Sequence, residues 1–368
     1  MQTGSSSHLY EEEDLTPREE EQPIPEQSTL PVSVIIPTYN RRKWLGEILN
    51  SLAYQTFPFE KFEVLIVDDG SSDNTGEIVQ ESYPFQLRYF YQTNQGDAAA
   101  RNLGAKQSLA EILVFLDDDI ILEKNFLVEL LAVQDAHINR IVVGTDILWL
   151  AETNPLNEGA TAPTDVLGSR TQEPLPFANV CSNNMSVRRD AYFAVGMMES
   201  LDFPGSSIWC DVDFSYRAFQ KGFEFLRSNR AFCWHRDYVS RSLNSQIKRW
   251  QEAAYRAVLL FHKYPELIHH LPMFTDKTPI VFSYDSPGLM IRKLFRRIFS
   301  SRLMMFMMEK TVLLLPNHSF TERLTRSLDR WIIGGYIFQG YWKGLREFGS
   351  IKVSQNSVVP AFPRRNKL

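Results

Sequence analysis

Three adjacent carboxylates, Asp117, Asp118 and Asp119, directly follow the apolar run Ile112–Leu116. Neighbouring carboxylates at the end of a strand repel one another unless a cation neutralises them. Carboxylate oxygens are the ligands that Mg²⁺ and Mn²⁺ prefer, usually together with oxygens of a substrate phosphate. The triplet therefore indicates a site for a divalent cation, with a solvated acidic turn that opens a helix as the alternative.

A second acidic pair, Asp68 and Asp69, closes the apolar run of residues 62–67. Carboxylates in this place can accept hydrogen bonds from a base N–H or from ribose hydroxyls. The alternative is a turn in which Ser72 or Asp73 caps the next helix. Paired aspartates at two strand ends are harder to explain by capping alone, which favours a nucleotide-binding edge.

Residues 94–104 contain a glycine, several small residues and Arg101 at the start of an expected helix. A helix N-terminus with small side chains lets the backbone approach an anion, and an arginine can bind a phosphate or a uracil carbonyl. The alternative is an ordinary packing helix with a surface arginine.

Two residues further along the chain are candidates for a general base and a ligand. Asp211 precedes a helix and is a candidate general base, because such a base must accept the proton of an acceptor hydroxyl. The alternative is N-capping of that helix, for which Asp213 is the better candidate. His235 lies among aromatic residues, where a packed core histidine and a ligand are both open interpretations.

Gln246, Arg249 and Trp250 have the i, i+3, i+4 spacing that places side chains on one helix face. Such a face can stack a sugar ring and bind a phosphate. The alternative is a surface helix anchored by one tryptophan.

Short apolar runs alternate with helical segments through the first half of the chain. The expected strands are 32–37, 62–67, 87–91 and 112–116, and the expected helices are 41–54, 74–82, 98–109 and 126–133. Nearly all-apolar strands indicate a sheet covered on both faces, and the alternation predicts a doubly wound, mostly parallel α/β sheet. Ligands bind at the carboxyl ends of such strands, where the acidic motifs fall.

The composition limits the function classes. A formal net charge of −5 over 368 residues does not favour nucleic-acid binding, and three scattered cysteines fit reduced thiols in the cytoplasm. The first 30 residues are acidic and contain prolines, without the pattern of a secretion signal, and we expect a disordered tail. We see no apolar run of the ~18 residues that a membrane span needs.

Taken together, these motifs resemble the family 2 glycosyltransferases, which have the GT-A fold, over roughly residues 31–260. The segments that carry the resemblance are 34–40, 67–73, 100–104, 115–119, 183–189 and 211–214. The family usually has Glu-Asp where this chain has Cys210 and Asp211, so the base is kept and a flanking carboxylate is lost.

The resemblance implies an inverting, metal-dependent transfer of a sugar from a nucleoside diphosphate sugar to a glycan or lipid-linked acceptor. A UDP-sugar is the first candidate for the donor, and Mn²⁺ or Mg²⁺ is the implied cofactor. It implies Asp211 as the base and Asp117, Asp119 and His235 as metal ligands. The implied donor-binding residues are Pro37, Thr38, Tyr39, Asp68, Asp69, Arg101, Asp117, Asp118, Asn184, Arg249 and Trp250.

Other functions stay open at this point. A sugar nucleotidyltransferase would use a similar sheet and acidic site, but it needs a glycine-rich loop after the first strand, and residues 37–40 contain no glycine. A non-catalytic sugar-binding or scaffold protein of the same fold is supported mainly by Cys210. The Gln246-x-x-Arg249-Trp250 motif also resembles processive polysaccharide synthases, but those enzymes carry several membrane spans, so we favour one or few transfers.

The region after residue 260 is expected to be a helical extension to residue 350, followed by a tail at 351–368. Residues 288–310 read as a basic amphipathic helix, a pattern that suits an anionic membrane surface on the inner face of the membrane. Its cationic residues are Arg292, Lys293, Arg296, Arg297 and Arg302. The alternative is a helix packed on the catalytic domain with a solvated basic face.

Overall fold

The computed structural model describes residues 30–134, 137–149, 154–155, 160, 171–200, 208–236, 242–314 and 319–351. Apart from Leu30 and Ile351, the two expected tails lie outside the described residues.

The first four strands form the parallel part of the sheet. They are β1 (Val32–Thr38), β2 (Phe62–Asp68), β3 (Gln86–Tyr91) and β4 (Ile112–Leu116), in the order β3-β2-β1-β4. All residues of β1 and β2 are buried, as expected for strands covered on both faces. The predicted parallel sheet is confirmed in this half of the domain.

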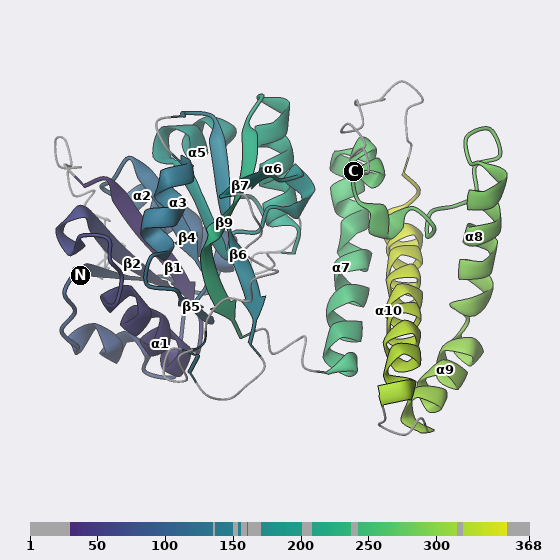
Figure 1. The fold of residues 1–368 in the computed structure, drawn as a ribbon. Coiled ribbons are helices and arrows are strands. Elements are labelled where there is room, and N and C mark those ends of the chain that lie inside the picture. The colour runs from purple at the N-terminus through teal and green to yellow at the C-terminus, as the bar shows by residue number, and fades with distance from the viewer. Residues whose placement is uncertain are drawn as a thin grey trace, which may run out of the picture.

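Helices cover both faces of these strands (Figure 1). They are α1 (Arg42–Ala53), α2 (Asp97–Gln107) and α3 (Phe126–Gln134). A Cβ atom at Gly104 would lie 2.4 Å from Ile35 Cγ2, so only glycine lets α2 pack this closely on β1. The helix expected at 74–82 is wrong in type, because the structure has the 3₁₀ helix η2 (Thr75–Gln80) there.

The second half of the sheet is mixed. Strand β8 (Asn184–Arg188) runs antiparallel to β4 and to β6 (Arg140–Leu148), and β9 (Glu224–His235) runs parallel to β6. Two short strands, β5 (Ile120–Leu122) and β7 (Gln172–Pro174), pair antiparallel with β9. In the β5–β9 register Ile120 lies opposite His235, which brings His235 to the end of the acidic triplet.

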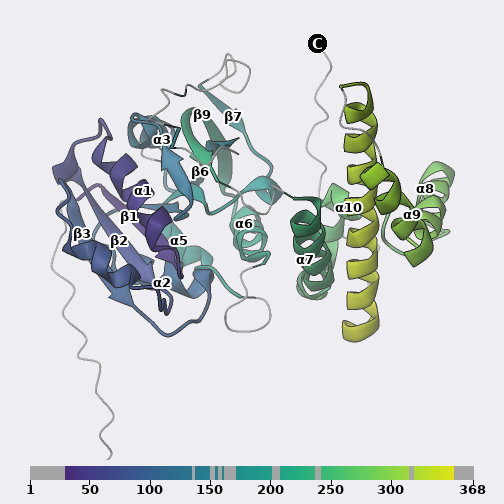
Figure 2. The same cartoon turned by 90° about the horizontal axis from the view of Figure 1, so that it is seen from below.

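The remaining helices form two groups. Helices α5 (Arg189–Val195) and α6 (Cys210–Gln220) pack on the sheet. The helical region comprises α7 (Leu243–Lys263), α8 (Pro287–Phe299), α9 (Arg302–Leu314) and α10 (Ser319–Phe348). In Figures 1 and 2, α7 faces the domain that contains the sheet, α10 lies beside α7, and α8 and α9 lie beyond α10.

Helices α7 and α10 pack unusually closely. A Cβ atom at Gly340 would lie 2.1 Å from the carbonyl oxygen of Gln251, and one at Gly344 would lie 2.5 Å from that of Tyr255. The two glycines are four residues apart and lie on the same face of α10. The domain boundary that we expected near residue 260 falls inside α7. Within the described residues, each helix is too short or too polar to cross a bilayer.

Candidate active site

A cleft of about 670 Å³ opens at the carboxyl ends of the parallel strands and is closed on one side by α7. Its lining residues are Pro37, Thr38, Tyr39, Arg41, Asp69, Asn94, Gly96, Asp97, Arg101, Asp117, Asp118, Ile208, Trp209, Asp211, Arg249, Trp250 and Ala253. Ten of the residues predicted from the sequence are among them. The cleft therefore lies where ligands bind in sheets of this kind.

Two arginines neutralise the acidic triplet. Arg101 Nη2 lies 2.5 Å from Asp117 Oδ1, and its Nη1 lies 2.6 Å from Asp97 on the first turn of α2. Arg41 Nη1 contacts Asp118 at 3.0 Å and Asp119 at 2.8 Å. The predicted repulsion between the three carboxylates is thus balanced by cations that belong to other elements.

The three carboxyl groups differ in their protonation equilibria. Burial raises the pKa of Asp117, although Arg101 opposes this effect, and burial raises the pKa of Asp118 to about 7 against the opposing charge of Arg41. Burial alone would also raise the pKa of Asp119, but His235 and Arg41 outweigh it and hold that pKa below its ordinary value. Asp119 is therefore the member of the triplet best prepared to remain an anion.

Asp119 and His235 form the part of the site that suits a metal. His235 Nε2 lies 3.3 Å from Asp119 Oδ1, and His235 Nδ1 lies 4.0 Å from Asp146 on β6. Asp119 Oδ1 is buried and accepts no well-formed hydrogen bond from the described residues. Asp146 is held by the side-chain amides of Asn183 and Asn184. The pKa of His235 is raised to about 9, because Asp119 outweighs the effect of burial.

The donor set fits a hard divalent cation that shares its coordination with a ligand. Among the described residues, no three His, Cys, Asp or Glu side chains are arranged to hold a metal by themselves. A carboxylate oxygen without a hydrogen-bond partner and a neighbouring imidazole supply only part of a coordination shell. Mg²⁺ and Mn²⁺ commonly take their remaining ligands from water and substrate phosphates.

Asp68 and Asp69 shape the edge of the cleft from within the protein. Asp68 accepts hydrogen bonds from the Ser71 N–H and from the Tyr89 hydroxyl, and it does not line the cleft. Asp69 does line it, and its carboxylate accepts from the backbone N–H groups of Gln95 and Gly96. The two aspartates thereby fix the loops on either side of the predicted nucleotide position.

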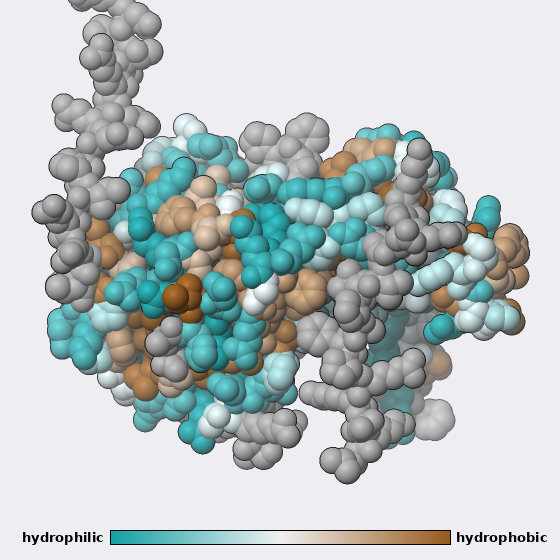
Figure 3. All heavy atoms as spheres, turned by 90° about the horizontal axis from the view of Figure 1, so that it is seen from above, coloured by the Kyte–Doolittle hydropathy of each residue, from teal (hydrophilic) through white to brown (hydrophobic). Residues whose placement is uncertain are grey.

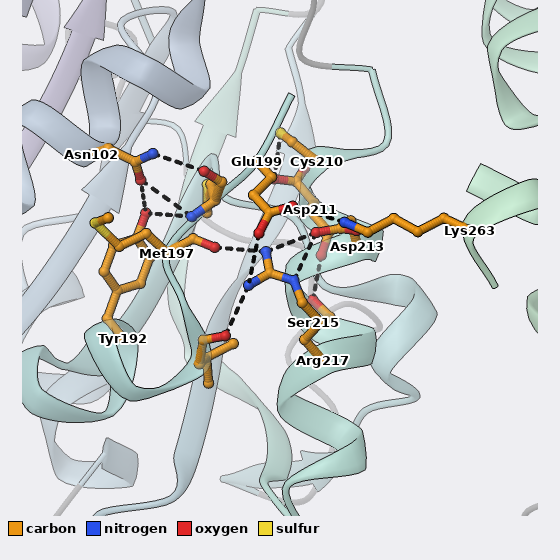
Figure 4. A network of polar contacts seen from close by, with 12 residues as sticks. Asn102, Tyr192, Met197, Glu199, Cys210, Asp211, Asp213, Ser215, Arg217 and Lys263 are labelled. Atoms are coloured by element: carbon orange, nitrogen blue, oxygen red, sulfur yellow. Dashed lines mark hydrogen bonds and ion pairs between the residues drawn. The ribbon is translucent and has the colours of Figure 1, made fainter. Parts of the chain in front are cut away.

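Asp211 and Asp213 occupy different environments on the first turn of α6 (Figure 4). Asp213 is fully buried and accepts from Arg217 and from Lys263 Nζ, each at 2.7 Å. Asp211 is half-buried and lines the cleft, and burial raises the pKa of Asp211 although Arg101 opposes the shift. The expectation that Asp213 caps α6 is wrong, because Trp209 is the N-cap residue and no side chain caps the helix.

Helix α7 provides the opposite wall of the cleft through Arg249, Trp250 and Ala253. The indole N–H of Trp209, directly before α6, donates to the carbonyl oxygen of Ala253 at 2.7 Å. This hydrogen bond links the segment that carries Asp211 to the helical region.

Four predicted residues do not line the cleft in this structure, namely Asp68, Asp119, Asn184 and His235, although Asp119 and His235 meet beside it. Sequence reasoning missed Arg41, Asp97 and Trp209. Arg41 directly follows the Pro37–Asn40 segment, and this adjacency was the available signal. Asp97 lies four residues before Arg101, a spacing typical of helical ion pairs.

Part of the chain is similar in sequence to known proteins. Residues 33–192 match the family described as glycosyl transferase family 2. Two relatives align with part of the chain: glycosyltransferase AglE of Haloferax volcanii, 47% identical over 96 residues, and the poly(ribitol-phosphate) beta-N-acetylglucosaminyltransferase TarS of Staphylococcus aureus, 41% identical over 115 residues. The alignments cover 25% and 30% of this chain, but only 32% and 20% of those relatives.

Among solved structures, the mannosyltransferase PcManGT from Pyrobaculum calidifontis, in complex with GDP-Man and Mn²⁺, has the same overall fold. The TM-score is 0.55 at 16% sequence identity, over 89% of this chain and 91% of that one. This likeness confirms the predicted GT-A fold with its helical C-terminal region.

Proposed function

We propose, from the family 2 glycosyltransferase domain at residues 33–192, that the protein transfers a sugar from a nucleoside diphosphate sugar to an acceptor hydroxyl with inversion at the anomeric carbon. The observation that carries this proposal is the cleft in which Asp117, Arg101 and Asp211 meet. An anion-binding arginine, a metal-binding carboxylate and a candidate base are the groups that such a transfer needs.

The donor would lie along the strand ends. Pro37, Thr38 and Tyr39 together with Asp69 form the side of the cleft that suits the nucleoside. Arg101, deeper in the cleft, suits the diphosphate. A UDP-sugar is the first donor to test, and a GDP-sugar is the alternative because PcManGT was solved with GDP-Man.

Asp119 and His235 would hold the Mn²⁺ or Mg²⁺, with Asp117 beside them. When bound, the cation supplies neutralisation of the charge that develops on the leaving diphosphate. Arg41 contacts Asp118 and Asp119 and lines the cleft, so its guanidinium is a second group that suits a donor phosphate.

Asp211 would act as the general base. It lines the cleft together with Asp117 and Arg101, and its raised pKa makes it a stronger proton acceptor than an exposed aspartate. The proton of the acceptor hydroxyl passes to Asp211 as the oxygen attacks the anomeric carbon from the face opposite the leaving group. Trp250 and Arg249 would hold the sugar from the side of α7.

The acceptor is proposed to be a glycan or a lipid-linked sugar. We propose action on the inner face of a membrane, and the three free cysteines support a reducing compartment. A non-catalytic sugar-binding protein of the same fold is the alternative, since Cys210 stands where the family usually has glutamate. Hydrolysis of the donor in the absence of acceptor separates the two, because a binding protein leaves the donor intact.

A thermal-shift series with UDP- and GDP-sugars tests the proposal. A ligand that binds only the native state at about 100 times its Kd stabilises it by about 2.7 kcal/mol. We expect a shift with one donor class that needs Mn²⁺ and is lost in Asp119→Ala. The matched control is Asp190→Ala, which changes an exposed aspartate that does not line the cleft and should keep the shift. Undiminished donor hydrolysis in EDTA would count against the metal.

A further inference from the structure

Helix α8 exposes a continuous apolar stripe. Ile291, Leu294, Phe295 and Ile298 are each 51–54% exposed. Their spacing of i, i+3, i+4 and i+7 places them on one face of the helix. The opposite face packs inward through Lys293, which is buried. A stripe of large apolar side chains left in water is unfavourable unless something covers it.

The neighbouring elements expose further large apolar residues. Helix α9 exposes Leu303, Phe306 and Met307, again at i, i+3 and i+4. The loop before α8 exposes Phe282, at 84%, and Tyr284. We call these nine residues, four on α8, three on α9 and two on the loop, the outer apolar surface. They lie on the part of the helical region that Figure 1 places beyond α10, and Figure 3 shows brown residues among teal and white ones at that end of the molecule.

The charges around this surface have one sign. Arg292 and Arg297 are exposed, and at 100° per residue they flank the α8 stripe on its two sides. Arg302 and Lys310 are exposed on α9. Glu309 is the only acid between residues 287 and 314, and it accepts a hydrogen bond from Tyr336.

The nearby acids are directed inward and are paired. Lys293 Nζ lies 2.6 Å from Asp285, and Arg296 Nε lies 3.0 Å from Asp276 and packs on Trp331. This corrects the expectation that all five cations of the helix face a membrane, because two of them are used in internal ion pairs. It also leaves the outer face with uncompensated cations.

We propose that the outer apolar surface docks reversibly on an anionic lipid bilayer. Aromatic and aliphatic side chains flanked by arginines match the boundary between acyl chains and negatively charged headgroups, where long cationic side chains reach up to phosphate. A second copy of this chain fits less well, because a symmetric contact would bring the same arginines face to face. Docking here covers no residue that lines the cleft, so the inference does not depend on the proposed reaction.

Vesicle flotation with the full-length protein tests the inference. We expect flotation with vesicles of phosphatidylcholine and phosphatidylglycerol at low salt, about tenfold less with phosphatidylcholine alone, and release by high salt. The variant R292E/R297E/R302E should lose flotation with anionic vesicles. The variant L294S/I298S/L303S should float less than the wild type at low salt, since it loses insertion but keeps the charges.

The matched control is K61E/K106E/K221E, which reverses three exposed lysines of the catalytic domain and should float like the wild type. Circular dichroism and donor hydrolysis report whether each variant folds. The inference fails if the wild type stays in the unbound fraction, or if the control loses flotation as fully as the arginine variant. It also fails if the patch variants abolish self-association in light scattering while flotation is absent, because the occupant is then a second copy.

Discussion

The cleft and the α8–α9 region both combine acidic, basic and aromatic residues, but the pairing of their charged residues differs. In the cleft, cations and anions from distant segments meet: Arg41 reaches Asp118, which is 77 residues away in sequence. On α8, the two cations that pair with acids turn inward, whereas Arg292 and Arg297 stay exposed, Arg297 with its guanidinium 5.8 Å from the ring centroid of Trp342.

The difference follows from how each region places its side chains. In the sheet, parallel register brings strand ends together, so one ligand can meet residues from the end of β1, from the segment after β4 and from α2 at once. On a helix, the 100° rotation per residue sorts side chains by face. The first arrangement suits a small ligand with several charges, and the second suits an extended surface. If this interpretation holds, changes in one region should leave the function of the other intact.

Asp211→Asn is expected to give the largest difference between the two regions, because it should change turnover in the cleft and leave vesicle binding unchanged. The amide keeps the size of the side chain but cannot take up a proton, so turnover should fall by on the order of 10²–10⁴. The thermal shift with donor and the flotation with anionic vesicles should equal those of the wild type, because neither needs a base. Steady-state kinetics measure the effect, and full activity of this variant together with an inactive Asp213→Asn variant would reassign the base.

Asp213→Asn should instead act on stability. Removing this buried carboxylate leaves Arg217 and Lys263 without their shared anion. Breaking a buried pair in this way costs on the order of 3 kcal/mol, the lower end of the usual range, because Lys263 is partly exposed. Urea unfolding measures the loss. Glu199→Gln, which removes the exposed partner of Lys263, serves as the control and should cost less than about 1 kcal/mol.

The pH profile sharpens the assignment of Asp211. Burial raises the pKa of Asp211, and a base must be deprotonated to work. Turnover should therefore be full above the pKa of Asp211 and fall about tenfold per pH unit below it, with a midpoint above the ordinary aspartate value of about 3.9. The residual activity of Asp211→Asn should lack this limb. If the variant shows the same fall in turnover at acidic pH, that fall belongs to another titrating group.

Parts of this arrangement could be predicted from the sequence because they depend on local pattern. The run Ile112–Leu116 is entirely apolar, and β4 has those bounds. The acidic triplet is the next segment of the chain, so its position at a strand end could be predicted without knowledge of any long-range contact. Strand β9 has no such apolar run, because Glu224–His235 mixes polar and apolar residues as it passes from β6 to β5.

The ion-pair partners of the predicted residues could not be predicted from a local sequence pattern. Arg41 meets Asp118 and Asp119 only because β1 and β4 are neighbours. Arg296 turns inward because it pairs with Asp276. Asp276 lies in a loop outside α8, so the sequence of the helix alone does not reveal this pair. Helical geometry did hold one usable signal, since Lys293 and Arg296 are opposite the apolar stripe of α8.

Trp209 joins the segment before α6 to α7, and its substitution tests how far the cleft depends on the helical region. Its indole N–H donates to Ala253 on α7, while its ring lines the cleft beside Trp250. Trp209→Phe keeps an aromatic ring near Phe274 but removes the donor. The net contribution of one such hydrogen bond is about 1 kcal/mol, so the free energy of unfolding should fall by that amount.

The kinetic consequence of Trp209→Phe should be confined to binding. Loosening α7 moves Arg249 and Trp250 relative to the strand ends but leaves Asp211 on α6, so KM should rise about fivefold, the equivalent of about 1 kcal/mol, while kcat changes little. Trp331→Phe, on α10 and outside the cleft, is the control and should leave KM unchanged. Flotation should be the same for both variants. A fall in kcat without loss of stability would mean that Trp209 acts on the base itself, and the cleft would then depend on the helical region for chemistry as well as for binding.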